Sequence, residues 1–277
     1  MTFIPPKTFA VGEVLSAVDM NVFVRDNTQA LKDQIDAGFR FIGRRIYSPP
    51  GNYTFAKADP FGDGSLGDLT VRALRVICVG GGGAGGGGAS TGAGQASVAA
   101  GGSSGSYAES IFTDLTALPA SVPVVVGAGG TGVSGATGND GTESSFSGVG
   151  ALAFFVRGRA GRGGARTTAA SGLLVTQGTL RSLDTSNGQI RVEGGVSEGA
   201  LFDTAVIGPT SNLLGGTGGS NPLGTGGRGL TNAQGRTFGE ARGFGGGGGG
   251  VSITSSNTSA VAGIDGGDGV VIVEVFI

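Results

Sequence analysis

Long glycine tracts constrain this chain more than any other feature of its sequence. Glycine makes up 61 of the 277 residues, roughly three times its usual share of about 7%. Half of residues 80–105 and nearly half of residues 215–250 are glycine. The chain has only 9 prolines and no Gly-X-Y period, so the tracts are not collagen. Unstructured loops of this length are unusual in a compact domain, so we expect residues 80–88 and 245–250 to be ordered and extended.

Ordering glycine has a large entropic cost, which other contacts must offset. Chains without side chains can lie side by side in polyproline-II geometry, with their backbone groups bonded to neighbouring chains. Simple disorder fits poorly, because the net charge is −2 and 38% of the residues are hydrophobic. We therefore expect polyglycine-II segments beside a domain with an apolar core.

Strands are predicted between the glycine tracts. These stretches are rich in β-branched and aromatic residues. They are residues 53–55, 69–79, 107–112, 122–126, 152–156, 172–176, 189–192 and 270–276.

The first forty or so residues differ from the rest, because they hold few glycines. Residues 2–14 predict an extended arm, and Ser16 with Asp19 predicts the start of a helix that ends at Gly38. A short seam of the coiled-coil type, in which Asn21 and Thr28 are polar, runs along this helix. Two interpretations stay open, namely an amphipathic helix lying on its own domain and an oligomerisation seam. The seam positions are Val24, Thr28, Leu31 and Ile35.

The chain lacks several residue types that catalysis and metal binding commonly use. The chain has no histidine and no tryptophan, so the commonest general base and metal ligand are absent. The single cysteine, Cys78, lies in an apolar run and is predicted to be buried. We see no signal peptide, and no apolar run approaches the ~20 residues that span a bilayer. A glycosidase pair drawn from Glu193, Glu198 and Asp203 is not excluded by composition.

Two motifs suggest ligands but have simpler explanations. Residues 127–132 spell G-x-G-x-x-G after a predicted strand, but the glycine-rich stretch that follows cannot form the helix that a dinucleotide site needs. Aspartates near Gly62–Gly64 and in residues 263–269 are better explained by turns than by calcium binding. We therefore predict no cofactor and no metal.

A cluster of arginines resembles an RGG segment that binds single-stranded nucleic acid. No aromatic residue is interleaved, so the sequence favours a solvated loop, with contact to an anionic cell-surface glycan as a further interpretation. We predict no nucleic-acid partner. The cluster, a candidate receptor contact, consists of Arg157, Arg159, Arg162 and Arg166.

The opening of the chain resembles minor tail proteins of siphophages that infect actinobacteria. Residues 12–21 follow their Gly-Glu-x-Leu-x-Ala-x-Asp-Met-Asn stretch, and Arg25-Asp26-Asn27 follows their Arg-Asp-Asn stretch. The remainder resembles the glycine-rich domain of phage tail tips and fibres, through Tyr53-Thr54-Phe55, the strand into Gly80, and residues 118–130. Ser144-Ser145-Phe146 and the glycine run 245–250 complete this pattern, and residues 165–210 depart from it as a possible insertion.

The resemblance implies a mainly β fold, in which a small β-sandwich is fused to polyglycine-II segments behind an N-terminal extended arm and one α-helix. We divide the chain into an anchoring arm (1–15), a helix for oligomerisation and tail attachment (16–45) and a glycine-rich domain (46–277). The resemblance further implies a homotrimer at the distal end of a virion tail, in contact with other tail-tip proteins and with a host cell-envelope glycan. Two alternatives are an envelope-degrading depolymerase and a surface- or ice-binding protein.

Overall fold

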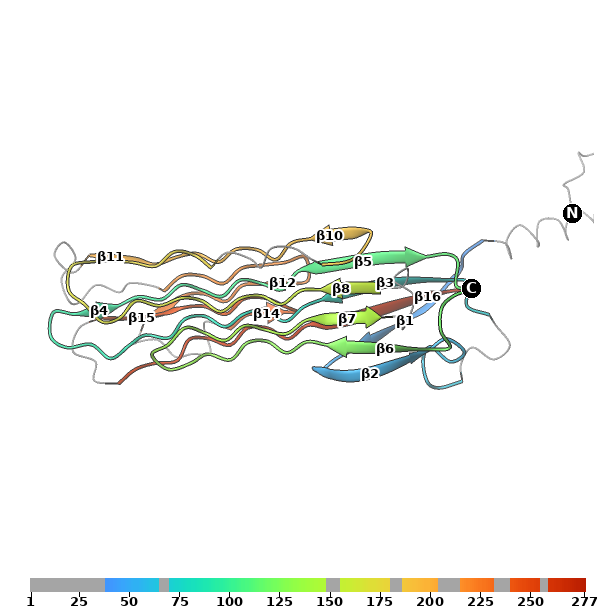
Figure 1. Cartoon of the computed structure of the whole chain (residues 1–277), viewed down its shortest axis with the longest axis horizontal. Helices are drawn as coiled ribbons and strands as arrows, with labels where there is room; N and C mark the ends of the chain where they lie inside the picture. The colour runs from blue at the N-terminus through green and yellow to red at the C-terminus, as the bar shows by residue number, and fades with distance from the viewer. Residues whose placement is uncertain are drawn as a thin grey trace, which may run out of the picture.

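Two antiparallel sheets form one end of the molecule (Figure 1). The computed structural model describes residues 38–64, 70–147, 155–179, 186–203, 215–231, 240–254 and 259–277. The five-stranded sheet has the order β1 (Phe41–Tyr47), β16 (Val270–Phe276), β3 (Ala73–Val79), β5 (Tyr107–Phe112) and β10 (Ile190–Val192). The four-stranded sheet has the order β2 (Gly51–Ala56), β6 (Ser121–Val126), β7 (Ser144–Ser147) and β8 (Phe155–Gly158).

The two sheets enclose the main hydrophobic core. Alternate residues of β3 face inward, so Leu74, Val76 and Cys78 are fully buried against the second sheet. Phe55 of β2 and Phe146 of β7 meet edge to face, with ring centroids 5.6 Å apart. Burial of such side chains removes apolar surface from water, which is the main favourable term in folding.

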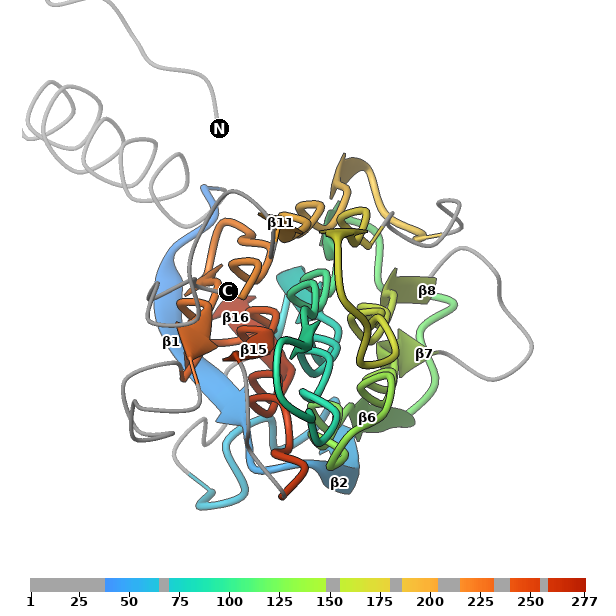
Figure 2. The same ribbon diagram turned by 90° about the vertical axis from the view of Figure 1, so that its left-hand side faces the viewer.

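Glycine-rich segments leave this end and run side by side along the long axis (Figure 1). Seen end-on, they form tight coils that lie next to one another (Figure 2). Short paired pieces occur among them. These are β4 (Ala96–Ser97), β9 (Leu173–Val175), β11 (Leu201–Asp203), β12 (Gly224–Thr225), β13 (Leu230–Thr231), β14 (Arg242–Gly243) and β15 (Val251–Thr254).

The segment 80–88, which continues from β3, bonds to its neighbours with a period of three. The amides of Gly80, Gly83 and Gly86 donate to the carbonyls of Ser106, Ser103 and Ala100. The intervening amides donate in the same order to two other antiparallel segments. Gly81, Ala84 and Gly87 donate to Thr142, Asn139 and Ala136, while Gly82 and Gly85 donate to Gly267 and Ile264.

The carbonyls of segment 80–88 accept from a further three segments. Their donors are the amides of Gly130, of Gly161 and Gly164, and of Gly248 and Val251. The segment 80–88 is thus surrounded by neighbouring segments on all sides, and successive residues bond to different neighbouring segments. A helix with about three residues per turn and no internal hydrogen bonds has this property.

Glycine is required here because backbone packs on backbone. A Cβ on Gly86 would lie 2.6 Å from the carbonyl oxygen of Ala165, and a Cβ on Gly87 would lie 2.6 Å from that of Val261. The same holds for most glycines between residues 80 and 105, whose added Cβ would meet a backbone atom of another segment. Any side chain at these positions would force the segments apart.

The structure is mainly β, as predicted, and most predicted strands are confirmed. β5 and β16 have the predicted bounds, and β2, β3, β6, β9 and β10 differ only at their ends. Of the predicted strand 152–156, the described part lies in β8. In the two large sheets, β1 and β7 were not predicted, and β1 takes in residues 41–45 that the sequence placed with the helix. The short strands β4 and β11 to β15 were not predicted either.

The arm and the predicted helix lie outside the described residues, as do Val24, Thr28, Leu31 and Ile35 of the predicted seam. The described ranges are strands, turns and extended segments. Within them, no helix has the length and apolar character to cross a membrane.

Candidate functional site

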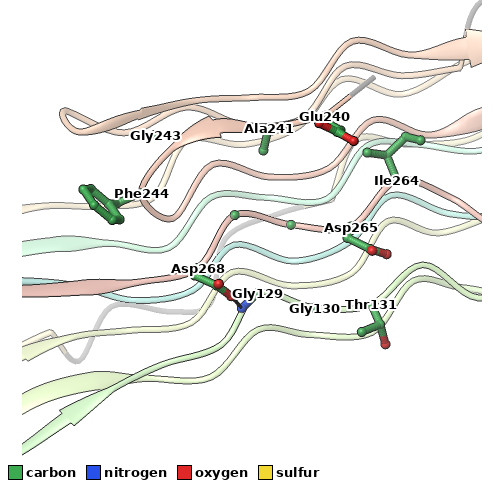
Figure 3. Close-up of a pocket in the computed structure, with 12 residues that line it drawn as sticks. Gly129, Gly130, Thr131, Glu240, Ala241, Gly243, Phe244, Ile264, Asp265 and Asp268 are labelled. Carbon is green, nitrogen blue, oxygen red and sulfur yellow. Dashed lines mark hydrogen bonds between the residues drawn. The ribbon is translucent and has the colours of Figure 1, made fainter. Parts of the chain in front are cut away.

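A groove of about 730 Å³ opens on the side of the glycine-rich bundle (Figure 3). It lies over the segment 263–269, between residues 129–131 and residues 240–244. Its floor is glycine backbone, because no side chain projects from Gly266 and Gly267. Its remaining walls are mixed, with polar Thr131, Glu240, Asp265 and Asp268 beside apolar Ala241, Phe244 and Ile264.

Two carboxylates of the groove are fixed by backbone amides. Asp268 Oδ1 accepts a hydrogen bond from the amide of Gly129 at 2.9 Å, and Asp265 Oδ1 accepts one from Gly132 at 2.6 Å. Residues three apart in a helix of this type lie in one row, about 9 Å apart along its axis. Both aspartates therefore stand on the same face of segment 263–269 and cap amides of one neighbouring segment.

The prediction that these two aspartates make turns is wrong. Residues 263–269 are extended, and the two side chains bond to glycines far away in sequence. The turn interpretation holds for Asp59, whose Oδ1 accepts from the amides of Gly62 and Gly64. Among the described residues, no group of three or more acidic or cysteine side chains is placed to hold a metal ion.

The four arginines of the candidate receptor contact differ in their contacts and in their exposure. Arg157 and Arg159 both pair with Glu143, with Arg157 Nη1 at 3.6 Å from its carboxylate. The Arg157 guanidinium also lies over the ring of Phe155, 5.3 Å from the centroid. Arg166 Nη1 donates to the carbonyl of Thr167 at 3.3 Å, while the side chain of Arg162 is exposed.

Nothing in the sequence around Glu143 predicts that it pairs with Arg157 and Arg159. It precedes β7, whose antiparallel pairing with β8 places Ser145 opposite Arg157. The pairing register, which the sequence does not contain, brings Glu143 to the arginines.

The G-x-G-x-x-G stretch is an extended segment of the bundle. Within the described residues 127–147 no helix follows β6, and the amides that would cradle a phosphate already have partners. Those of Gly127 and Gly129 donate to Ser144 Oγ and Asp268 Oδ1. The amide of Gly130 donates to the carbonyl of Gly82.

Two of the candidate glycosidase residues, Glu193 and Glu198, lie along one extended segment, and Asp203 is the last residue of β11. The carbonyls of Gly195 and Glu198 accept from the amides of Ser104 and Gly101, which keeps the segment straight. At about 3.1 Å per residue, the Cα atoms of Glu193 and Glu198 lie about 15 Å apart. The carboxyl groups of a glycosidase pair lie about 5–9.5 Å apart, so the side chains of Glu193 and Glu198 would have to lean toward each other to form one.

A charge network on the outer face of the five-stranded sheet was missed by the sequence analysis. Arg75 Nε lies 2.6 Å from Glu109, and Arg75 Nη1 lies 3.1 Å from Glu274. Hydrogen bonds from Arg75 and Tyr107 lower the pKa of Glu109, although burial opposes them. Burial and the hydrogen bond to Glu109 raise the pKa of Tyr107 to about 12. Cross-strand register unites these residues, so no local motif could have shown them.

Comparison with known protein families gives a match over most of the chain. No curated protein matches the sequence. The family described as a glycine-rich domain matches residues 67–276. This match runs from before β3 to the end of β16, and it includes the groove, the arginines and the central segment 80–88. The chain therefore belongs to the glycine-rich domain family.

Proposed function

We propose that this protein is a structural component of a phage tail tip, and that it contacts the host surface by binding, without catalysing a reaction. The observation that carries the proposal is the period-three bonding of segment 80–88 to neighbours on every side. We interpret this pattern as a polyglycine-II lattice attached to a small β-sandwich. The resemblance of Gly12–Asn27 to minor tail proteins of actinobacteriophages supplies the biological setting.

The positions of the chain ends and of the distal turns support a role in presenting those turns to a binding partner. The described chain starts and ends together, because Arg40 and Ile277 exchange backbone hydrogen bonds at the sheet end. The glycine segments turn at the opposite end (Figure 1). An N-terminal arm and helix would therefore anchor the subunit beside the sheets, and the lattice would hold its distal turns away from the anchor.

The lattice suits a binding role at a tail tip. Buried hydrogen bonds between backbone groups are satisfied along its length, so the body gains stiffness without a large apolar core. Contact residues on a rigid scaffold need little ordering when they bind. Of the arginine cluster, Arg162 is the exposed member and is our candidate for pairing with an anionic envelope glycan.

The proposal includes three copies per tip, which bind other tail-tip proteins through the N-terminal segment. Weak contacts repeated in three copies gain from effective concentration. We place the protein in the virion, at the distal end of the tail.

Antibody labelling of intact virions tests this function. We expect gold label at the distal end of the tail in electron micrographs. Label on the capsid, or virions without label, would overturn the proposed location. Purified protein that releases sugars or peptides from host envelopes would overturn binding as its mode of action.

A further inference from the structure

Backbone amides point into the groove beside segment 263–269. In polyglycine-II geometry the amides point in three directions, and residues three apart share a direction. One set of amides of this segment donates to segment 245–250, and a second set donates to segment 127–132. Segment 80–88 bonds to both of these neighbours, so it lies between them on the inner side. The third set of amides, to which Asp268 belongs, therefore points outward into the groove.

The lattice of backbone hydrogen bonds ends at this groove. The amide of Asp268 donates no hydrogen bond within the described part of the chain. The amides of Gly129 and Gly132, on the adjacent wall, bond to the carboxylates of Asp268 and Asp265 and not to another segment (Figure 3). Backbone donors of proteins are nearly always bonded when they are covered. An extended chain that lies in the groove can therefore continue the lattice by offering a carbonyl to Asp268.

The groove is also acidic. Glu240, Asp265 and Asp268 line it and are exposed, and the other described residues that line it are uncharged. Each aspartate accepts one amide, but a carboxylate has about four lone-pair sites and can still bind a cationic group. A nucleic acid or an anionic glycan would be repelled here. The charge of the groove therefore favours a cationic ligand.

The spacing of the two aspartates selects the shape of that ligand. The amides that hold their carboxylates are also three residues apart, so the carboxylates keep a spacing of about 9 Å along the segment. Side chains three apart in a polyproline-II chain have the same spacing, since each residue advances about 3.1 Å. Side chains on one face of a β-strand repeat at about 7 Å, and side chains four apart on a helix lie about 6 Å apart along its axis.

We propose that the groove binds a basic segment of another protein in polyproline-II geometry, with arginine or lysine at every third residue. Its basic side chains pair with Asp265 and Asp268, and one of its carbonyls accepts from the amide of Asp268. Phe244 and Ile264 contact its apolar part, as aromatic residues do in grooves that bind proline-rich peptides. The inference goes beyond the proposed function and depends on neither the trimer nor the tail location.

Titration of the full-length protein with synthetic peptides, followed by NMR of its backbone amides, tests this inference. The probe is a peptide of three Arg-Pro-Pro repeats, and the control peptide has the same composition with its arginines adjacent. We expect the repeat to bind about fivefold tighter or more, because only the repeat can pair with both aspartates at once. The amide resonances of Gly129 and Asp268 should shift, and that of Thr137, an exposed residue outside the groove, should not.

Removal of charge from the groove gives a second test. Asp265→Asn combined with Asp268→Asn removes both charges but keeps an oxygen to cap each backbone amide, so circular dichroism should show the wild-type fold. We expect this variant to bind the repeat about fivefold more weakly or less tightly still. The matched control is Asp140→Asn, because Asp140 is exposed and accepts from the amide of Gly163 but lies outside the groove. This control should bind the repeat as wild type does.

Three results would overturn the inference. The first is equal affinity of wild type for the two peptides, which would show attraction by charge alone. The second is a loss of affinity in Asp140→Asn as large as that in the groove variant. The third is the absence of any shift at Gly129 and Asp268 at millimolar concentrations of the repeat.

Discussion

At the scale of single residues, glycine has two separate roles in this protein. Gly94 and Gly172 adopt positive φ angles of 70° and 93°, which side chains rarely tolerate. Gly86 has no such requirement and is glycine only because another backbone occupies the place of its Cβ. The second role explains why glycine is so abundant, since each segment of the bundle meets several others.

The central segment should therefore not tolerate alanine. Gly86→Ala puts a Cβ 2.6 Å from the carbonyl oxygen of Ala165, so we expect a loss of about 1–3 kcal/mol in the free energy of unfolding, as for overpacked cores. Gly92→Ala is the control, because its Cβ meets only the flexible end of Gln95, at 3.1 Å. We expect the control to stay within about 0.5 kcal/mol of wild type. Equal stability of both variants in urea denaturation would contradict the packing.

Glu109 should make stability depend on pH. Its pKa is lowered from the ordinary value of 4.5, chiefly by the hydrogen bond from Arg75. A lowered folded-state pKa adds stability above the unfolded value, and this stability is lost as pH falls through the folded value. Glu109→Gln should cost about 1–3 kcal/mol at pH 7, because it leaves Arg75 and Tyr107 with a weaker partner.

The measurement is thermal unfolding of both proteins between pH 7 and pH 3. The difference between them should shrink as the pH falls below about 4.5. If the difference in stability between wild type and Glu109→Gln stays constant over this range, the effect comes from packing, and ionisation of the Glu109 carboxyl is not its cause.

At the scale of elements, β-branched and aromatic residues predicted the strands, while the glycine segments carry no such signal. β5 and β16 were predicted because β-branched and aromatic residues dominate them. β7 was missed because three of its four residues are serine. The neighbours of Gly82 could not be predicted, since they include Gly267 and glycine sequences do not encode register.

The candidate site was predictable only in part, for the same reason. The sequence singled out Asp265, Asp268 and the arginines, of which Arg157 lies in β8 of the four-stranded sheet. Their partners Gly129, Gly132 and Glu143 come from other segments, and lattice or sheet register alone brings them close. Asp-Gly sequences suggest turns locally, whereas here the carboxylates cap amides across the bundle.

Removal of one capping carboxylate should loosen one element locally. Asp268→Ala leaves the amide of Gly129 without its acceptor, so we expect a loss of about 1 kcal/mol and faster hydrogen exchange near Gly129. Glu240→Ala, in the same groove, is the control and should leave that exchange unchanged. Unchanged exchange in Asp268→Ala would show that the carboxylate does not hold this segment.

At the scale of the whole molecule, strands of the sheet continue directly into glycine-rich segments. β3 continues into segment 80–88, and segment 263–269 continues into β16. The sheet core and the glycine-rich bundle are therefore continuous along the chain and form one body. The described part of the chain begins at Gly38, just before β1.

Truncation should separate folding from assembly. A chain that lacks residues 1–37 keeps β1 and every described strand, so we expect a folded protein with an unchanged β-type circular dichroism spectrum. If the predicted helical seam supports the trimer, light scattering at micromolar concentration should show a smaller mass than for the full chain. If the truncated chain is still a trimer of the same stability, the N-terminal segment contributes nothing to the free energy of association.

Hydrogen exchange of residues 80–88 tests most directly whether the glycine-rich tracts form an ordered, hydrogen-bonded body. Each amide of residues 80–87 donates to a carbonyl of a neighbouring segment, with donor–acceptor distances of 2.8 to 3.2 Å. We therefore expect these amides to exchange as slowly as those of β3, in the native full-length protein. Exchange of the whole segment at the rate of an open loop, while β3 stays protected, would contradict the account.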